Sequence, residues 1–232
     1  MNPRDLDELL SARDLPPLPP GRVGQIERAV LADLKPVRPL APAGAYLAGL
    51  AGIFIAVCAA GAYIAGQYGW LVLSDLQRIA VFVPLAAVAA VLVFSLVRQM
   101  SPGAKHTRSS ALLAAVLFSL LLVGMIAVFQ PAHEHAFVAM GLGCFRMGMI
   151  VAMPAAFLFV LLLHRGAAVS PALTGAAAGG LAGLAGLAVL EVRCPNLNLY
   201  HIIVWHISVV VVCMIAGLVF SSVTFRRWRS NQ

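Results

Sequence analysis

Charged residues are scarce in this sequence. Asp, Glu, Lys and Arg make up 11% of its 232 residues, whereas 61% are hydrophobic. A soluble domain carries about 25% charged residues, so this scarcity excludes a soluble globular protein and predicts a polytopic membrane protein. Because lipid offers no partner for a free backbone N–H or C=O, we expect an all-α fold in which the spanning segments form a helix bundle.

The apolar runs also lack acidic or basic residues near their middle. Asp75, Glu134 and Glu191 all fall at the outer ends of runs. Ion-coupled transporters and proton pumps normally need ionisable groups inside the membrane, so the sequence argues against transport. No two pairs of histidines are placed to face each other in mid-membrane, which argues against a b-type haem.

Catalytic motifs are missing as well. The sequence has no HExxH, no P-loop and no GxSxG pattern, the signatures of zinc peptidases, nucleotide hydrolases and serine hydrolases. It has four cysteines but no CxxC pair, which weakens the case for a membrane thiol oxidoreductase. We therefore expect neither an enzyme nor a resident cofactor.

The sequence does contain six apolar runs, each close to the roughly 20 residues that a helix needs to cross a bilayer. We expect a cytoplasmic tail of residues 1–41, a six-helix transmembrane domain of residues 42–222 and a basic cytoplasmic C-tail of residues 223–232. The predicted spans lie at about 44–66, 79–97, 110–129, 145–163, 172–190 and 202–222.

Lysine and arginine are distributed unevenly between the two sides that six spans define. Thirteen of the sixteen fall in the N-terminal tail, the 98–109 loop, the loop of Arg165 and the C-tail. The other side holds only Arg78, Arg146 and Arg193. Because basic residues collect on the cytoplasmic side of membrane proteins, we expect both termini in the cytoplasm.

Small residues recur at four-residue spacing in the first and fifth spans. Such stripes let helix backbones approach closely in lipid. We expect them to serve packing within the bundle, and homodimerisation is the alternative. The stripes consist of Gly44, Ala48, Gly52, Ala56 and Ala60 in the first span and Gly175, Gly179 and Gly183 in the fifth.

The four cysteines fall into two groups. Cys58 and Cys213 lie deep in the first and last spans, where a cysteine behaves as a small apolar residue. Cys144 and Cys194 are expected in outer loops, where a span begins or ends. Only the second pair is therefore a candidate for chemistry.

Each outer cysteine has an arginine close in sequence, since Arg146 follows Cys144 by two residues and Arg193 directly precedes Cys194. A nearby guanidinium favours the thiolate, the reactive and metal-binding form. Three interpretations stay open: a structural disulfide in an oxidising periplasm, a pair that responds to an oxidant or transiently binds a metal, and two unrelated thiols. Spacing alone favours the disulfide.

Histidines flank the same outer regions. His133 and His135 would ligate a soft or borderline metal together with the thiolates if their loop folded over the 191–201 loop. His201 and His206 are five residues apart, or about 140° around an α-helix. We therefore expect them not to share a metal and to be interfacial polar groups, whereas His201 and Trp205 share a helix face.

The N-terminal tail is predicted to form two short amphipathic helices, "NPRDLDELL" and "RVGQIERAVLADLKP", around the break "LPPLPPG". Their apolar faces suit a protein partner that receives a helix in a groove. The alternative, a helix lying on the inner leaflet, is disfavoured because the tail carries six acidic and six basic residues. The expected contact residues are Leu6, Leu9, Leu10, Val23, Ile26, Val30, Leu31 and Leu34.

This pattern resembles the NrsF-type proteins, bacterial membrane anti-sigma factors that hold an extracytoplasmic-function sigma factor. A short helical tail, six spans, "GLGCFRMG", the segment from "LLLHRGAAVS" to "HIIVWH" and a basic C-tail carry the likeness. It covers essentially the whole chain and is strongest over residues 144–210. Its most specific element is Cys194-Pro195 followed by His201 and Trp205-His206.

The resemblance implies that the tail sequesters a sigma factor at the bacterial inner membrane and that Cys144 and Cys194 are the signal-responsive thiols. The neighbouring arginines, Pro195, the outer histidines and Trp205 would support them. In this hypothesis a heavy metal or oxidant reacts at the outer face, the last three spans repack around Gly179 and Gly183, and the tail lets the sigma factor go. The expected partners are the sigma factor and the lipid bilayer, with no direct nucleic-acid contact.

The alternative is a small membrane transporter or channel for a metal ion or small solute. In that case the outer histidines and cysteines would form a capture site. This hypothesis predicts flux across the membrane and a dispensable N-terminal tail.

Overall fold

The chain divides into two compact units, Met1–Pro39 and Leu40–Gln232. In the first unit the described segment contains one helix, α2 (Arg22–Asp33). The first helix predicted for the tail lies outside the described residues. The structure, a computed structural model, describes residues 21–33, 41–100, 108–133, 136–164 and 170–230.

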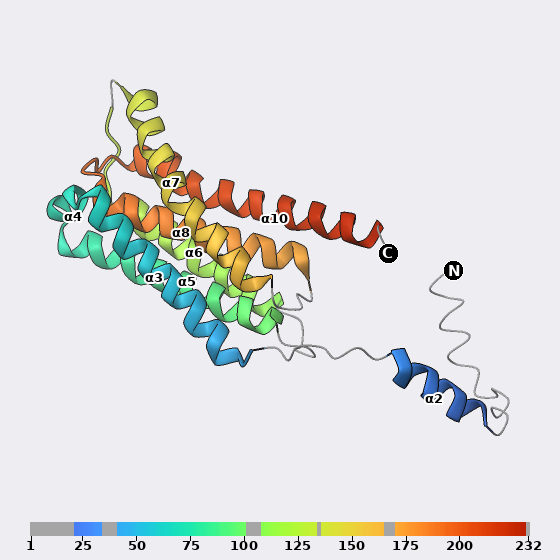
Figure 1. Ribbon diagram of the computed structural model, residues 1–232. Helices are drawn as coiled ribbons and strands as arrows, with labels where there is room; N and C mark the ends of the chain where they lie inside the picture. The colour runs from blue at the N-terminus through green and yellow to red at the C-terminus, as the bar shows by residue number, and fades with distance from the viewer. Residues whose placement is uncertain (1–20, 34–40, 101–107, 134–135, 165–169, 231–232) are drawn as a thin grey trace. The chain divides into compact units, whose positions relative to one another are not determined.

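The second unit is a bundle of long helices (Figure 1). Six of its helical segments are long and apolar enough to cross a membrane, and no β-strand occurs among the residues described. The predicted all-α, six-helix membrane fold is therefore confirmed. The elements are α3 (Ala43–Ala65), α4 (Tyr68–Val72), α5 (Asp75–Met100), α6 (Arg108–Val128), α7 (Phe137–Leu163), α8 (Pro171–Arg193), α9 (Leu199–His201), a π-helical turn (Ile202–His206) and α10 (Ile207–Ser230).

Two helices begin earlier than their apolar runs. Helix α5 begins at Asp75, because an acidic residue in the first turn is favourable at a helix N-terminus and lets the helix extend past the apolar run. Helix α7 begins at Phe137, and its first turns pack through Gly141 against the Trp205 ring. As a result Cys144 lies well inside α7, and its predicted position in an outer loop is wrong.

Helix α8 is the centre of the bundle. Every residue from Ala178 to Glu191 is buried. Figure 1 shows α8 between the other long helices, and it packs against α3, α5, α7 and α10. A helix of glycine, alanine and leucine suits this position, because small side chains admit neighbours from all sides.

The glycine stripe of α8 lies directly against α10. A Cβ on Gly179 would collide with the carbonyl oxygen of Cys213, and one on Gly183 would meet the backbone of Val210. The fifth-span stripe is thus used within the chain, as predicted. This contact brings two backbones together, so a displacement of α8 cannot be absorbed by side chains alone.

The stripe of the first span differs. Gly44, Ala48, Gly52, Ala56 and Ala60 are exposed on α3, and no atom lies within 4 Å of a Cβ built on Gly44 or Gly52. The expectation that this stripe packs within the bundle is wrong for the described residues. Homodimerisation through it stays a prediction.

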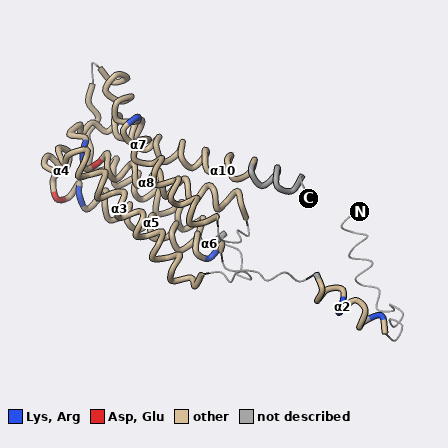
Figure 2. Tube along the Cα trace, viewed as in Figure 1, with Lys and Arg blue, Asp and Glu red and all other residues tan. Residues whose placement is uncertain are grey.

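The outer surface of the bundle suits a bilayer. Large apolar side chains are exposed on α3, α5, α6, α7 and α10. The described acidic and basic residues of the bundle lie toward its ends (Figure 2). This arrangement indicates a multi-pass membrane protein.

Candidate functional site

Helix α8 ends at a proline, and this positions Cys194. Pro195 disfavours helical backbone in the residue before it, and Cys194 accordingly has extended backbone with φ −79° and ψ 116°. Its N–H still donates to the carbonyl of Leu190 at 2.7 Å. The thiol is therefore fixed at the last turn of the buried helix.

The chain that follows is anchored by Asn198. The Asn198 side chain accepts from the N–H of Tyr200 at 3.1 Å, and it exchanges hydrogen bonds with the backbone of Ala132 at 2.7 and 3.2 Å. The N–H of Leu199 also donates to the carbonyl of Gln130 at 3.0 Å. The loop before α7 therefore meets the loop after α8.

A π-helical turn then brings two histidines together. The N–H of Ile207 donates to the carbonyl of Ile202 across five residues, so side chains at that spacing come onto one face. The rings of His201 and His206 lie 5.3 Å apart in a T-shaped arrangement. The prediction that they point apart is wrong, because it assumed an α-helix.

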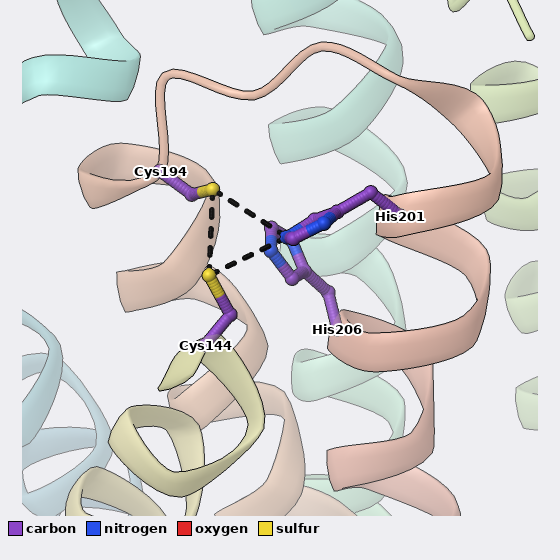
Figure 3. Close-up of side chains that lie close together, drawn as sticks. All are labelled: Cys144, Cys194, His201 and His206. Atoms are coloured by element: carbon purple, nitrogen blue, oxygen red, sulfur yellow. Dashed lines mark hydrogen bonds between the residues drawn. The ribbon is translucent and has the colours of Figure 1, made fainter. Parts of the chain in front are cut away.

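Both histidines face the two thiols (Figure 3). The Sγ atoms of Cys144 and Cys194 lie 3.5 Å apart. His201 Nε2 lies 3.4 Å from Cys144 Sγ and 3.8 Å from Cys194 Sγ. Cys144, Cys194, His201 and His206 each offer one ligand atom, and these atoms all lie within 4.8 Å of one another. We call these four residues the thiol–histidine cluster.

A buried carboxylate completes the arrangement. Glu191 Oε1 lies 2.7 Å from His206 Nδ1, and the two side chains are only 3% and 1% exposed. The other ring nitrogen, His206 Nε2, is buried and has no hydrogen-bond partner in the described part of the chain. Sequence reasoning missed Glu191. The available signal was its spacing of three residues from Cys194, which places both on one helix face.

The Cys194 thiol is protonated more firmly than an ordinary thiol. The hydrogen bond with Cys144 and burial raise its pKa, and the neighbouring histidines oppose that shift. The expectation that Arg193 would favour the thiolate is therefore wrong. No disulfide joins Cys144 to Cys194 in the structure.

Two glycines allow neighbouring elements to close over the cluster. Gly69 of α4 is buried, and a Cβ there would collide with the carbonyl oxygens of Glu191 and Cys194. Trp205 lies over Gly141, and its ring is 5.7 Å from that of Phe137. Trp205 thus holds the π-helical turn against α7 and lies outside the cluster.

The remaining predicted site residues are more dispersed. Arg146, Pro195 and His133 are exposed and Arg193 is half-buried, and none of them belongs to the group of possible metal ligands found among the described residues. His135 lies outside the described residues. The two loops do meet, which was the condition for His133 to join the thiols, but Asn198 makes the contact with Ala132.

The predicted sigma-binding residues are only partly described. Ile26, Val30 and Leu31 are 53%, 55% and 59% exposed on α2. Val23 lies in α2, but its side chain is outside the description, as are Leu6, Leu9, Leu10 and Leu34.

One comparison with known proteins gives a match. The model of the family NrsF, described as negative regulator of sigma F, matches residues 30–228. The matched segment begins within α2 and contains all four residues of the thiol–histidine cluster. No curated protein and no solved structure matches the chain.

Proposed function

The chain belongs to the NrsF family, the negative regulators of sigma F, and from this premise we propose that it is a bacterial inner-membrane anti-sigma factor for an extracytoplasmic-function sigma factor. Membership of a regulator family indicates a non-enzymatic role. In the proposed resting state, residues 1–41 hold the sigma factor at the cytoplasmic face and keep it from RNA polymerase.

The observation that carries the sensing part of the proposal is the thiol–histidine cluster. The sulfurs of Cys144 and Cys194 lie 3.5 Å apart without a disulfide, one on α7 and one at the end of α8. A heavy metal ion that binds both sulfurs, or an oxidant that joins them, would couple α7 to α8 at this point. Cys144 and Cys194 are therefore the proposed signal-sensing residues.

The packing of α8 supports a route from the cluster to the rest of the bundle. Gly175, Gly179 and Gly183 place the α8 backbone against α10, and the cluster takes its two histidines from the segment that leads into α10. Close packing without side-chain slack favours discrete arrangements over gradual deformation. A change at the cluster would therefore shift α8 and α10 together and loosen the hold of the tail on the sigma factor.

The tail supports the proposal through an apolar surface. Ile26, Val30 and Leu31 leave more than half of their side-chain surface exposed on α2. An amphipathic helix of this kind docks its apolar face into a groove of a partner protein. In the proposal that partner is the sigma factor.

The test is capture of a sigma factor by the full-length protein in nanodiscs. Bacterial lysate is passed over the immobilised protein, and bound proteins are identified by mass spectrometry. The variant Ile26→Asp with Leu31→Asp should lose the sigma factor, because it places charges on the apolar face. The matched control Gln25→Asp with Ala32→Asp adds the same charges to exposed positions on the opposite face and should retain it.

The second half of the experiment adds an inducer to the loaded protein. Cadmium ions or a thiol oxidant should release the sigma factor from the wild type. Capture that survives Ile26→Asp with Leu31→Asp would exclude this face as the contact. Absence of any sigma factor, together with metal flux in proteoliposomes, would favour the transporter or channel.

A further inference from the structure

The thiol–histidine cluster has the composition of a closed metal site. Two sulfurs and two ring nitrogens come from α7, the end of α8 and the helical segment before α10. Thiolate and imidazole together suit zinc and softer ions, whereas magnesium and calcium take oxygen ligands. The donor set therefore selects a borderline or soft ion over the hard cations.

The separations between donor atoms also suit a tetrahedral ion. Zinc–sulfur bonds of about 2.3 Å and zinc–nitrogen bonds of about 2.0–2.1 Å place tetrahedral donors about 3.3–3.8 Å apart. The sulfurs are 3.5 Å apart, and His201 Nε2 is 3.4 and 3.8 Å from them. These atoms need little movement to surround an ion.

Glu191 orients the fourth donor. An ionised carboxylate only accepts hydrogen bonds, so at 2.7 Å it is His206 Nδ1–H that donates to Glu191 Oε1. The ring can then bind a metal only through Nε2, once that atom carries no proton, and Nε2 is the buried atom without a hydrogen-bond partner in the described residues. Metal-binding histidines are commonly held by a carboxylate in this way.

We propose that Cys144 Sγ, Cys194 Sγ, His201 Nε2 and His206 Nε2 form a four-coordinate site for a divalent zinc or cadmium ion, with Glu191 as a positioning residue. On binding, each thiol loses its S–H proton to solvent and His206 loses any proton on Nε2, so at least two protons leave for each divalent ion that enters. No electron is transferred. The site goes beyond a cysteine pair, because it requires the π-helical turn that brings both histidines to the sulfurs.

This inference deepens the proposed function, on which it rests for its role in signalling, whereas metal binding is independent of the sigma factor. The first measurement uses reduced wild-type protein in nanodiscs with Co²⁺ as a spectroscopic probe. One Co²⁺ per chain with tetrahedral d–d bands and sulfur-to-metal charge transfer is expected, together with release of at least two protons in dilute buffer. An octahedral spectrum without charge transfer would overturn the site.

Variants then separate the ligands from the positioning residue. Cys144→Ser and Cys194→Ser should each lose about half of the charge-transfer intensity, and His201→Gln and His206→Gln should keep it but bind Zn²⁺ much more weakly. Glu191→Gln should keep the tetrahedral spectrum and weaken Zn²⁺ binding about 10–100-fold, as loss of a carboxylate partner does elsewhere. Cys213→Ser is the matched control, since this buried cysteine of α10 lies outside the cluster.

The outcomes distinguish this inference from the proposed function. Unchanged Zn²⁺ affinity in both histidine variants would overturn the four-ligand site and leave a sensor made of cysteines alone. Sigma-factor capture on the same preparations is the separate readout for the anti-sigma function. Retained capture without tetrahedral metal binding would reject only the metal site, and metal binding without capture would reject only the anti-sigma function.

Discussion

The two ends of α8 both hold buried polar side chains, but the two groups are satisfied differently. Near the start of the helix, the Thr174 hydroxyl lies 2.7 Å from Gln99 Oε1, Gln99 Nε2 lies 3.3 Å from Ser95 Oγ, and Ser95 Oγ lies 3.1 Å from Ser110 Oγ. This hydroxyl–amide cluster joins α5, α6 and α8 through hydrogen bonds among neutral groups. About 30 Å away along the helix, the thiol–histidine cluster leaves His206 Nε2 without a hydrogen bond inside the described chain.

This difference separates a structural contact from a binding site. A buried polar group without a partner is costly, so a group of side chains whose members pair with one another tends to fix a packing arrangement. A buried ring nitrogen without a hydrogen-bond partner beside two thiols fits the metal site proposed above. Helix α8 is thus held by hydrogen bonds to α5 near its start and carries a proposed metal ligand at its end. This suits the proposed function, in which a change at the cluster moves α8.

The largest expected effect comes from removing either sulfur of the thiol–histidine cluster. In Cys144→Ser and Cys194→Ser, sigma-factor capture should persist while cadmium-induced release falls to background, because a serine oxygen is a poor ligand for soft ions. Release is measured from the loaded protein in nanodiscs. Cys213→Ser should release as the wild type does. Normal release in both single variants would reject the sensing mechanism.

The second prediction concerns the contact between α8 and α10, which lies between the two clusters. Gly179→Leu should lower the free energy of unfolding by about 3 kcal/mol, since overpacking a close contact forces backbones apart and a Cβ here meets the Cys213 carbonyl. Gly52→Leu on α3 is the matched control, because that position is open. Denaturant titration in micelles measures both. Equal losses would show that the α8–α10 contact has no special role.

The third prediction tests whether the hydroxyl–amide cluster is only structural. Thr174→Val keeps the shape but leaves Gln99 Oε1 without its hydroxyl partner, which should cost about 1–2 kcal/mol of stability. The same variant should bind Zn²⁺ with unchanged affinity. Adding Gln99→Leu should recover part of the stability, because removing both partners avoids a buried unpaired group. A weakened Zn²⁺ affinity in Thr174→Val would show that the hydroxyl–amide cluster affects metal binding and is not only structural.

The sequence was sufficient for the fold because hydropathy is a local property. Six apolar runs predicted six helices, and the scarcity of charged residues predicted that these helices lie in a membrane. The flanking sequences single out Cys144 and Cys194, and the expectation that Cys194 lies where a span ends is confirmed. These inferences needed no knowledge of which helix contacts which.

The arrangement of the cluster depends on contacts between distant segments, so local rules failed there. The spacing of His201 and His206 was interpreted with α-helical geometry, whereas the structure has a π-helical turn, held by Asn198 at its start and by Trp205 against α7. Glu191 counted as an interfacial charge because its partner His206 lies fifteen residues on, across the α8–α10 contact. No periodicity in the sequence joins those two residues.

The last and smallest prediction concerns the reactivity of Cys194 in the metal-free protein. Because the hydrogen bond with Cys144 and burial raise its pKa, its alkylation should be slow at neutral pH and keep accelerating as pH rises past the ordinary thiol pKa. Cys144→Ala removes the hydrogen bond with Cys144, the largest cause of the raised pKa, so Cys194 should then react severalfold faster at neutral pH.

The folded chain also holds the Cys194 proton more tightly than the unfolded chain does. The stability that this proton contributes is therefore present below the ordinary thiol pKa and is lost as pH rises through the raised pKa. Peptide mass spectrometry after timed alkylation measures the rate, and a slower reaction in Cys144→Ala would show that the neighbouring sulfur favours the thiolate.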